Sequence, residues 1–169
     1  SGIEELVNKG IDEILLIPLY PQHAMASTET ILVLADQIKN EFFPQIKFTN
    51  LPAFYNHSDY IRVLSNSVQD YLKDKEWEHL LFSYHGIPER HIRKTDITKS
   101  HCKIDGSCCQ TTSPAHDFCY RHQCYETTKK VVEYLGLKEG TYSSSFQSRL
   151  AGQPWLKPYT DKVIEGFAK

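Results

Sequence analysis

All five cysteines of this 169-residue chain fall in one short segment. They are Cys102, Cys108, Cys109, Cys119 and Cys124. A secreted disulfide framework usually spreads its cysteines through a small chain, whereas a chain of this length can bury an apolar core and needs no covalent staples. Thiolates at short spacing in a loop are the usual ligands of iron–sulfur clusters, and four of them suffice for a [2Fe–2S] centre. The segment is therefore interpreted as a metal site.

The spacing of the cysteines leaves the identity of the metal open. Four thiolates also suit a tetrahedral zinc ion, but zinc sites commonly show two close pairs with about two to four residues between their members. Only Cys119 and Cys124 have such a spacing. One thiol is spare, and the adjacent Cys108 and Cys109 compete for one place. Zinc, free thiols and a disulfide remain the alternatives to a cluster.

Four histidines lie near the cysteines, but the sequence assigns none of them as a metal ligand. They are His91, His101, His116 and His122. Histidines in exposed loops are usually solvated, and the surrounding residues predict a loop. These side chains are therefore expected to face water.

A fifth histidine, His85, stands at the end of an apolar run, in the segment Ser83-Tyr84-His85-Gly86-Ile87-Pro88. In open α/β sheets, ligands bind outside the carboxyl ends of the strands, which is where this run would deliver the imidazole. Gly86 permits a sharp turn and a close approach, and Pro88 stiffens the exit. An imidazole so placed can accept a proton or bind a metal ion, although a histidine at a strand end can equally be a hydrogen-bonded structural residue.

Three motifs, in this order along the chain, resemble signatures of the ferrochelatase family. They are Pro18-Leu19-Tyr20-Pro21-Gln22 followed by Ala26-Ser27-Thr28, the His85 segment, and Phe146-Gln147-Ser148-Arg149 followed by Pro154-Trp155-Leu156 and Thr160-Asp161. The resemblance implies a lyase that inserts Fe²⁺ into protoporphyrin IX or a related porphyrin, late in haem biosynthesis. It also implies the chelatase fold, in which two similar Rossmann-like domains flank a porphyrin cleft.

The same resemblance implies roles for individual residues. His85 would be catalytic and would bind the substrate iron. A flat apolar macrocycle with carboxylates at its rim asks for aromatic walls and a polar edge. The expected substrate-binding residues are Tyr20, Gln22, Tyr84, Gln147, Ser148, Arg149 and Trp155. For each aromatic side chain, packing in the core is the alternative. His23 and Ala24 depart from the family pattern, so the contacts of that loop with the porphyrin stay open.

The resemblance also bears on completeness and on the cysteines. Family members are about twice this length, and their second catalytic residue, a glutamate, would fall beyond Lys169, so the chain is expected to be an internal fragment that is inactive alone. Some bacterial ferrochelatases carry a [2Fe–2S] cluster in an insert of this kind, which favours a cluster held by four of the five cysteines. Family members without an insert also have cysteine in a segment similar to that of Cys124, which weakens the case for Cys124 as a ligand. A structural or redox-sensing role is expected, because metal insertion changes no oxidation state.

The elements that must position these residues alternate between strands and helices. Strands are predicted at about 13–19, 46–51, 80–84 and 142–146, and helices before Gly10, at 25–41, after Ser58, at 121–135 and from Thr160. Between His85 and Asp117 the periodicity disappears, which predicts an irregular connection. Alternation of this kind implies parallel crossovers, hence an α/β fold of Rossmann-like parallel sheets with helices on both faces.

The polar stretch Lys73-Asp74-Lys75-Glu76 is the most plausible domain boundary. Residues 1–75 would form the C-terminal half of a first Rossmann-like domain. Residues 76–169 would form the N-terminal part of a second one, including the cysteine-rich insert at about 99–124.

Composition narrows the partners. A formal net charge of −2 gives no reason to expect nucleic acid binding. No apolar run approaches the roughly 18 residues of a membrane-spanning helix, and no signal pattern opens the sequence, so a cytoplasmic protein is expected, with peripheral membrane contact as an open alternative. The expected partners are a porphyrin and ferrous iron, and the sequence does not indicate an oligomeric state. Two other functions stay open: a chelatase for another tetrapyrrole, against which the Trp155 block argues, and an iron–sulfur or redox-sensing module on an α/β scaffold.

Overall fold

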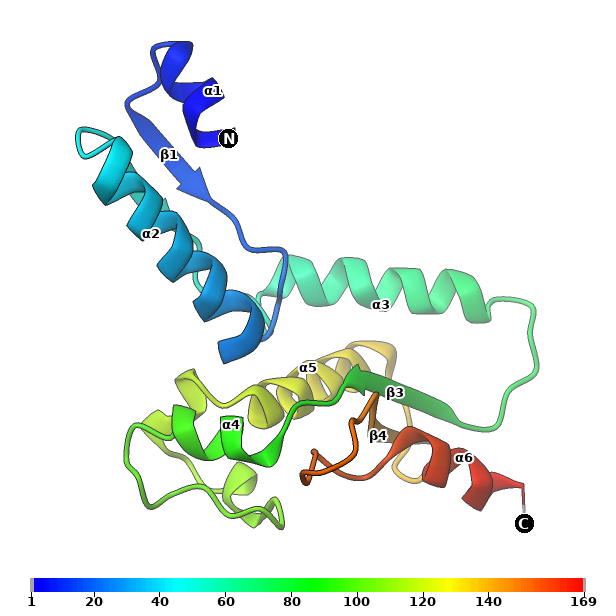
Figure 1. Ribbon diagram of the computed structural model, residues 1–169. Coiled ribbons are helices and arrows are strands. Elements are labelled where there is room, and N and C mark those ends of the chain that lie inside the picture. Colours follow the sequence, from blue (N-terminus) through cyan, green and yellow to red (C-terminus); the bar gives the residue numbers. More distant parts are fainter. Residues whose placement is uncertain (1, 169) are drawn as a thin grey trace. The chain divides into compact units, whose positions relative to one another are not determined.

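The computed structural model describes residues 2–168 and divides them into two compact units, the first ending at Phe54 and the second beginning at Tyr55. Both units contain a pair of parallel strands flanked by helices (Figure 1). The α/β class predicted from the alternating pattern is therefore confirmed. The expected boundary between two Rossmann-like domains lies in the turn after Leu72 and stays a prediction, because compactness alone does not define where a family domain begins.

The first unit is a strand–helix–strand crossover. Its elements are α1 (Gly2–Asn8), β1 (Glu13–Leu16), the π-helical turn η1 (Met25–Glu29), α2 (Thr30–Phe42) and β2 (Lys47–Asn50). β1 and β2 pair in parallel, with Ile14 opposite Phe48. Parallel strands require a long connection between them, and η1 with α2 supplies it. Thr30 Oγ1 donates to the carbonyl oxygen of Met25 at 2.9 Å, which satisfies a backbone group where the π-helical turn passes into α2.

The first unit buries less apolar surface than its sequence predicts. In the run expected to be a buried strand, Ile14 is buried, but Leu15 is 54% exposed and Ile17 is 47% exposed. On α2, Ala35 is buried while Leu34 is exposed. Within the described residues β1 pairs with β2 alone, so two short strands and one crossover helix cover only part of each face.

The second unit contains the remaining elements. They are α3 (Ser58–Leu72), β3 (Leu80–His85), α4 (Glu89–Thr95), the 3₁₀ turns η2 (Ser107–Gln110) and η3 (Pro114–Asp117), α5 (Tyr120–Leu135), β4 (Tyr142–Gln147) and α6 (Thr160–Phe167). β3 and β4 pair in parallel from Leu80 opposite Tyr142 to His85 opposite Gln147. The crossover runs from β3 through α4, the cysteine-rich segment and α5 to β4, in green, yellow and orange in Figure 1.

The core of the second unit lies around the ends of the two strands. Phe146 on β4 is 1% exposed, and its ring lies near those of Tyr84 and Tyr125, with centroids about 6 Å away. Val131 on α5 and Leu156 after β4 are equally buried. This packing gives the carboxyl ends of β3 and β4 a rigid support.

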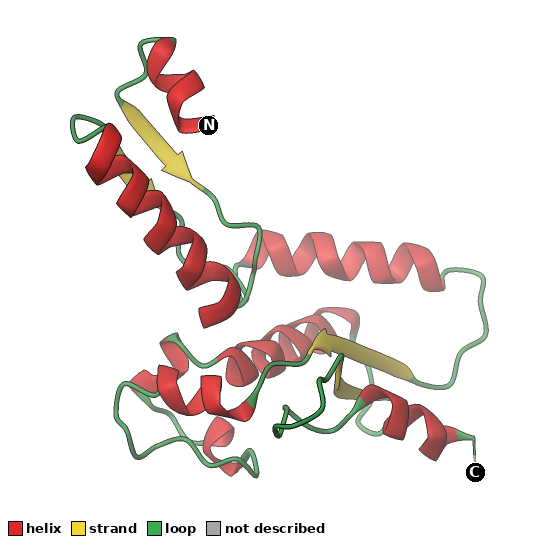
Figure 2. Ribbon diagram, viewed as in Figure 1, coloured by secondary structure: helices red, strands yellow, loops and turns green. Residues whose placement is uncertain are grey.

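The segment from His85 to Asp117 is more ordered than the sequence predicts. Helix α4 and the turns η2 and η3 interrupt it, and Figure 2 shows loop between them. In α4 only Ile92 is buried, at 1% exposure. A two-turn helix with one buried residue shows no hydrophobic period, which is why the sequence indicated an irregular connection.

Across residues 2–168, no helix combines the length and the apolar character needed to cross a bilayer. The expected cytoplasmic location, with or without peripheral membrane contact, stays a prediction.

Candidate active site and cysteine-rich segment

His85 is the last residue of β3 and its side chain is exposed. It lies opposite Gln147, the last residue of β4, so the carboxyl ends of both strands meet at this position. The pairing continues one residue further, because Gly86 N–H donates to the carbonyl oxygen of Gln147 at 2.6 Å. The imidazole therefore projects from a fixed backbone at the edge where α/β sheets bind ligands.

The ring of His85 is oriented by its own chain. Its Nδ1 lies 2.7 Å from the carbonyl oxygen of Gly86. A carbonyl oxygen can only accept, so Nδ1 carries the hydrogen and donates it. In the neutral ring Nε2 then keeps its lone pair. Nε2 is therefore the nitrogen of His85 through which a proton or a metal ion would bind.

Gly86 is required by close approach. A Cβ atom at this position would lie 2.8 Å from the carbonyl oxygens of both Gln147 and Ser148. Trp155 borders the same turn, with a ring carbon 3.6 Å from that Cβ position. Its indole is only 8% exposed, and its Nε1–H is buried without a hydrogen-bond partner among the described residues. Trp155 therefore packs behind the turn that carries His85.

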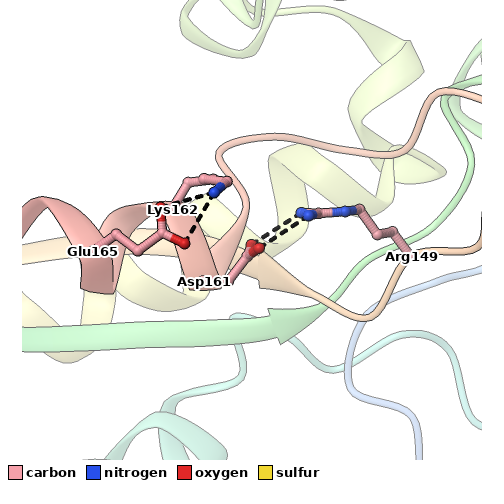
Figure 3. A network of polar contacts seen from close by, with 4 residues as sticks. All are labelled: Arg149, Asp161, Lys162 and Glu165. Atoms are coloured by element: carbon pink, nitrogen blue, oxygen red, sulfur yellow. Dashed lines mark hydrogen bonds and ion pairs between the residues drawn. The ribbon is translucent and has the colours of Figure 1, made fainter.

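The polar residues after β4 are gathered at the same edge. Ser83 Oγ donates to Gln147 Oε1 at 3.4 Å, and Ser148 adopts a positive φ of 63°. Arg149 binds both carboxylate oxygens of Asp161 at 2.9 Å, as Figure 3 shows, and stacks over Tyr159. The hydrogen bonds from Arg149 hold the pKa of Asp161 below its usual value. The cation expected at the rim is therefore already paired in this structure.

Of the remaining substrate-binding candidates, Tyr84 lies in this unit, whereas Tyr20 and Gln22 belong to the other one. The hydroxyl of Tyr84 lies 2.8 Å from Thr128 Oγ1 on α5, and this Oγ1 lies 3.0 Å from Ser144 Oγ. The Tyr84 side chain therefore points towards α5. Burial raises the pKa of Tyr84 and keeps its hydroxyl protonated. Tyr20 is 40% exposed in the loop after β1. The structure thus brings together the candidates from β3 and β4.

Arg121, the second residue of α5, hydrogen-bonds to Cys108 and Cys109 and interacts electrostatically with Cys102 and Cys119. Arg121 Nη2 donates to Cys108 Sγ at 3.3 Å, and the backbone N–H of Lys103 donates to the same sulfur at 3.2 Å. Cys109 and Cys119 hydrogen-bond to each other; this bond lowers the pKa of Cys119 and raises that of Cys109. Burial, together with the neighbouring Cys108, raises the pKa of Cys102 to about 11.

Arg121 itself is a buried cation in need of an anion. It is 2% exposed, and its hydrogen bonds go to the carbonyl oxygens of Ile104 and Lys103 and to the side chains of Cys108 and Cys109. In the part of the chain that the structure describes, no carboxylate forms an ion pair with it. An unpaired buried charge is costly, so an anionic group between these sulfurs would stabilise the segment. Thiolate sulfurs, if deprotonated, would supply such a negative charge beside Arg121.

Cys124 is placed differently from the other four. It is fully buried on α5, and its side-chain partner is Tyr120. Burial raises the pKa of this thiol strongly, which favours the protonated form. Cys124 therefore has a different hydrogen-bond partner from the cysteines that interact with Arg121.

Three histidines hold the Cys108–Cys109 turn, which the sequence did not predict. Nε2 of His101 and of His116 lie 3.0 Å and 3.2 Å from the carbonyl oxygen of Cys108, and Nδ1 of His122 lies 3.2 Å from that of Cys109. His116 is 9% exposed and stacks on His122 at 3.6 Å. The expectation of a solvated side chain is therefore wrong for His116, because these rings bind main-chain carbonyls. The enrichment of histidine near the cysteines was the sequence feature that could have indicated this role.

Within residues 2–168, no three side chains of His, Cys, Asp or Glu converge on one ion-sized position. A [2Fe–2S] centre shares its four thiolates between two irons, so its ligands occupy two positions rather than one.

A family model and the curated relatives of this chain indicate the same family. The family model described as Ferrochelatase matches residues 1–169. Among curated proteins, ferrochelatases of Opitutus terrae, Pseudomonas fluorescens SBW25 and Bdellovibrio bacteriovorus are 43%, 36% and 36% identical to the chain, and each match covers the whole chain. The chain spans about half the length of these relatives, 49%, 50% and 49% respectively.

Proposed function

The chain belongs to the ferrochelatase family, and we propose that the full-length protein that contains it inserts Fe²⁺ into protoporphyrin IX or a related porphyrin in haem biosynthesis. Because the reaction forms nitrogen–metal bonds, the enzyme would be a lyase. One observation carries the proposal: an exposed histidine, on the motif that resembles the family's, ends a strand with its Nδ1 bound and its Nε2 available.

The chemistry of insertion matches this imidazole. Two pyrrole N–H bonds must break while iron–nitrogen bonds form, so two protons leave the macrocycle and no electron is transferred. Nε2 of His85 can accept one of these protons or bind the incoming iron. The second acceptor would be the glutamate that the family resemblance places beyond Lys169. The 169-residue chain alone would then be inactive.

The polar edge beside His85 suits a carboxylate-bearing substrate. Gln147, Ser148 and Arg149 follow β4 directly, and the guanidinium of Arg149 has the fork geometry that binds carboxylates. A propionate would exchange with Asp161 for this fork. In this unit we assign porphyrin contacts to Tyr84 and Trp155; the contacts expected for Tyr20 and Gln22, which belong to the first unit, stay predictions.

The decisive experiment replaces His85 in the full-length enzyme. His85→Ala should lower the rate of iron insertion about a hundredfold to ten-thousandfold, the usual range for a positioned acid or base. The reaction is followed anaerobically by loss of porphyrin fluorescence. His57→Asn is the matched control, because His57 caps α3 through Asp59 N–H and asparagine can replace that cap. Equal rates for His85→Ala and the wild type would refute the catalytic role.

We also propose that Cys102, Cys108, Cys109 and Cys119 hold a [2Fe–2S] cluster, with Cys124 as the spare thiol. When bound, the cluster supplies an anionic, redox-active centre. Support comes from the buried charge of Arg121 and from the N–H groups that donate to Cys108 Sγ, since hydrogen bonds to the sulfurs tune such centres.

Iron and acid-labile sulfide in anaerobically purified protein test the cluster. Two irons and two sulfides per chain are expected, with visible absorption, whereas zinc without sulfide would refute it. Removing the cluster with a chelator should lower the melting temperature, because metal binding contributes folding energy to ligands that are otherwise unconstrained. An unchanged melting temperature would exclude the structural role.

A further inference from the structure

Tyr120, the first residue of α5, connects the cysteine-rich segment with the turn that carries His85. Its side chain is 9% exposed, and its hydroxyl donates to the main-chain carbonyl oxygen of His85 at 2.9 Å. Cys119 immediately precedes it as the N-cap residue of the helix. Tyr120 thus follows a proposed cluster ligand directly in the chain, and its side chain binds the proposed catalytic residue.

The hydrogen bond from Tyr120 is one of two that hold the peptide group between His85 and Gly86 in place. The carbonyl oxygen of His85 and the N–H of Gly86 belong to the same planar unit. Tyr120 binds the oxygen from α5, and the carbonyl of Gln147 binds the N–H from β4. The plane of this peptide is therefore held from two separate elements.

The orientation of that peptide determines the orientation of the imidazole. The Gly86 carbonyl follows directly in the chain, and it is the acceptor for Nδ1 of His85. Rotation of the His85–Gly86 peptide would move this acceptor and with it Nε2. Small displacements of a reacting group cost large factors in rate, so a bond that prevents rotation affects turnover.

Tyr120 is bound on its other side by Cys124. The two side chains hydrogen-bond. Both residues lie on α5, within the second unit.

We propose that Tyr120 is a positioning residue for His85, which ties the start of α5, directly after Cys119, to the orientation of the imidazole and so to the rate of metal insertion. The proposal rests on the proposed function, since it assumes that His85 acts in insertion.

The first test is Tyr120→Phe in the full-length enzyme, which keeps the buried ring and removes the hydroxyl. One net hydrogen bond is worth about a tenfold change in rate, so kcat should fall about tenfold. KM for the porphyrin should stay within about twofold, because Tyr120 is buried and its hydroxyl is bound to the His85 carbonyl. Visible absorption, iron and sulfide content and the melting temperature are measured on the same samples.

Tyr134→Phe is the matched control, because Tyr134 lies on the same helix and its hydroxyl donates to Asn66 on α3. This variant should keep kcat and KM. A Tyr120→Phe enzyme with the same kcat as Tyr134→Phe would overturn the proposal. So would a Tyr120→Phe enzyme that lost its cluster or melted far below the wild type, because Tyr120 would then act as a support of the segment.

If the wild-type enzyme itself inserts no iron, the proposed function fails; if it does and Tyr120→Phe matches it, only the inference fails.

Discussion

The turn at His85 and the cysteine-rich segment are held in different ways. At His85 the backbone is fixed mainly by the backbone: Gly86 binds Gln147, and Leu156 N–H binds the carbonyl of Ile87 at 3.0 Å. In the cysteine-rich segment, side chains bind main-chain groups. Asp96, which is 7% exposed, accepts from the N–H groups of Thr98 and Cys102 at 2.9 Å and 2.7 Å.

This difference has a consequence for stability. Parallel strand pairing is cooperative, and each contact in it supports its neighbours, so the His85 turn depends on steric fit more than on any one side chain. The cysteine-rich segment has no such ladder: its backbone bonds lie within short turns, such as Cys109 N–H to the carbonyl of Gly106, and polar or charged side chains connect these turns. Substitutions that add bulk should therefore disrupt the His85 turn. Substitutions that remove a charge or a hydrogen-bond donor should disrupt the cysteine-rich segment.

The largest effect is expected from Gly86→Ala. The added methyl would lie 2.8 Å from two carbonyl oxygens of the opposite backbone, neither of which can rotate away as a flexible side chain would. The turn must shift, and a shift of about 1 Å at a reacting group can cost about a hundredfold in rate. We expect at least that loss in iron insertion, measured by porphyrin fluorescence.

The control for this change is Gly166→Ala in α6, where nothing lies within 4 Å of the added carbon. There alanine should stabilise the helix by roughly 0.5–1 kcal/mol and leave the insertion rate unchanged. Normal activity in Gly86→Ala would show that the turn is adaptable, and the contrast between the two regions would disappear.

A second, smaller effect is expected from Arg121→Gln, which removes a charge and not space. The change leaves the carbonyl oxygens of Lys103 and Ile104 without their donor, and takes the cation from between the thiols. We expect the free energy of unfolding to fall by roughly 2–3 kcal/mol, in line with the loss of charged hydrogen bonds in a buried site, and the cluster absorption to weaken. Urea denaturation and visible spectra measure both.

Arg62→Gln serves for comparison, since Arg62 pairs with Asp59 on an exposed face of α3. That pair should be worth less than about 1 kcal/mol. Equal losses in the two variants would mean that Arg121 is an ordinary surface cation, contrary to its 2% exposure.

The same contrast explains how much the sequence could predict. The His85 turn was visible because its geometry requires particular residue types at consecutive positions, a glycine and a proline after the histidine. Strands β1 and β3 were visible as apolar runs. By contrast, the partners of the cysteine turn come from His101, His116 and Arg121, which share no period and no motif.

Two further features needed coordinates. Tyr120 meets His85 across 35 positions of sequence, and a tyrosine at the start of a helix carries no sign of that contact. The sequence named Tyr84 and Trp155 as aromatic walls, but a pattern of residue types does not show that one hydroxyl binds α5 and that the indole packs behind Gly86. Whether these two side chains touch the porphyrin stays a prediction.

The smallest effect is expected at the edge of the His85 region, from Asp161→Asn. Arg149 is bound by both oxygens of this carboxylate, and the two side chains are 41% and 51% exposed, so water screens the pair and its loss should barely change stability. Freed from its partner, the guanidinium should bind a substrate carboxylate more readily, lowering KM for a dicarboxylate porphyrin about twofold.

Since Arg149 depresses the pKa of Asp161, the pair persists above the ordinary carboxyl value of 3.8 and is lost only as the pH falls through the lowered pKa. The change in KM should therefore be the same at every neutral pH, and a KM that rises in the variant would place Asp161, and not Arg149 alone, at the substrate rim.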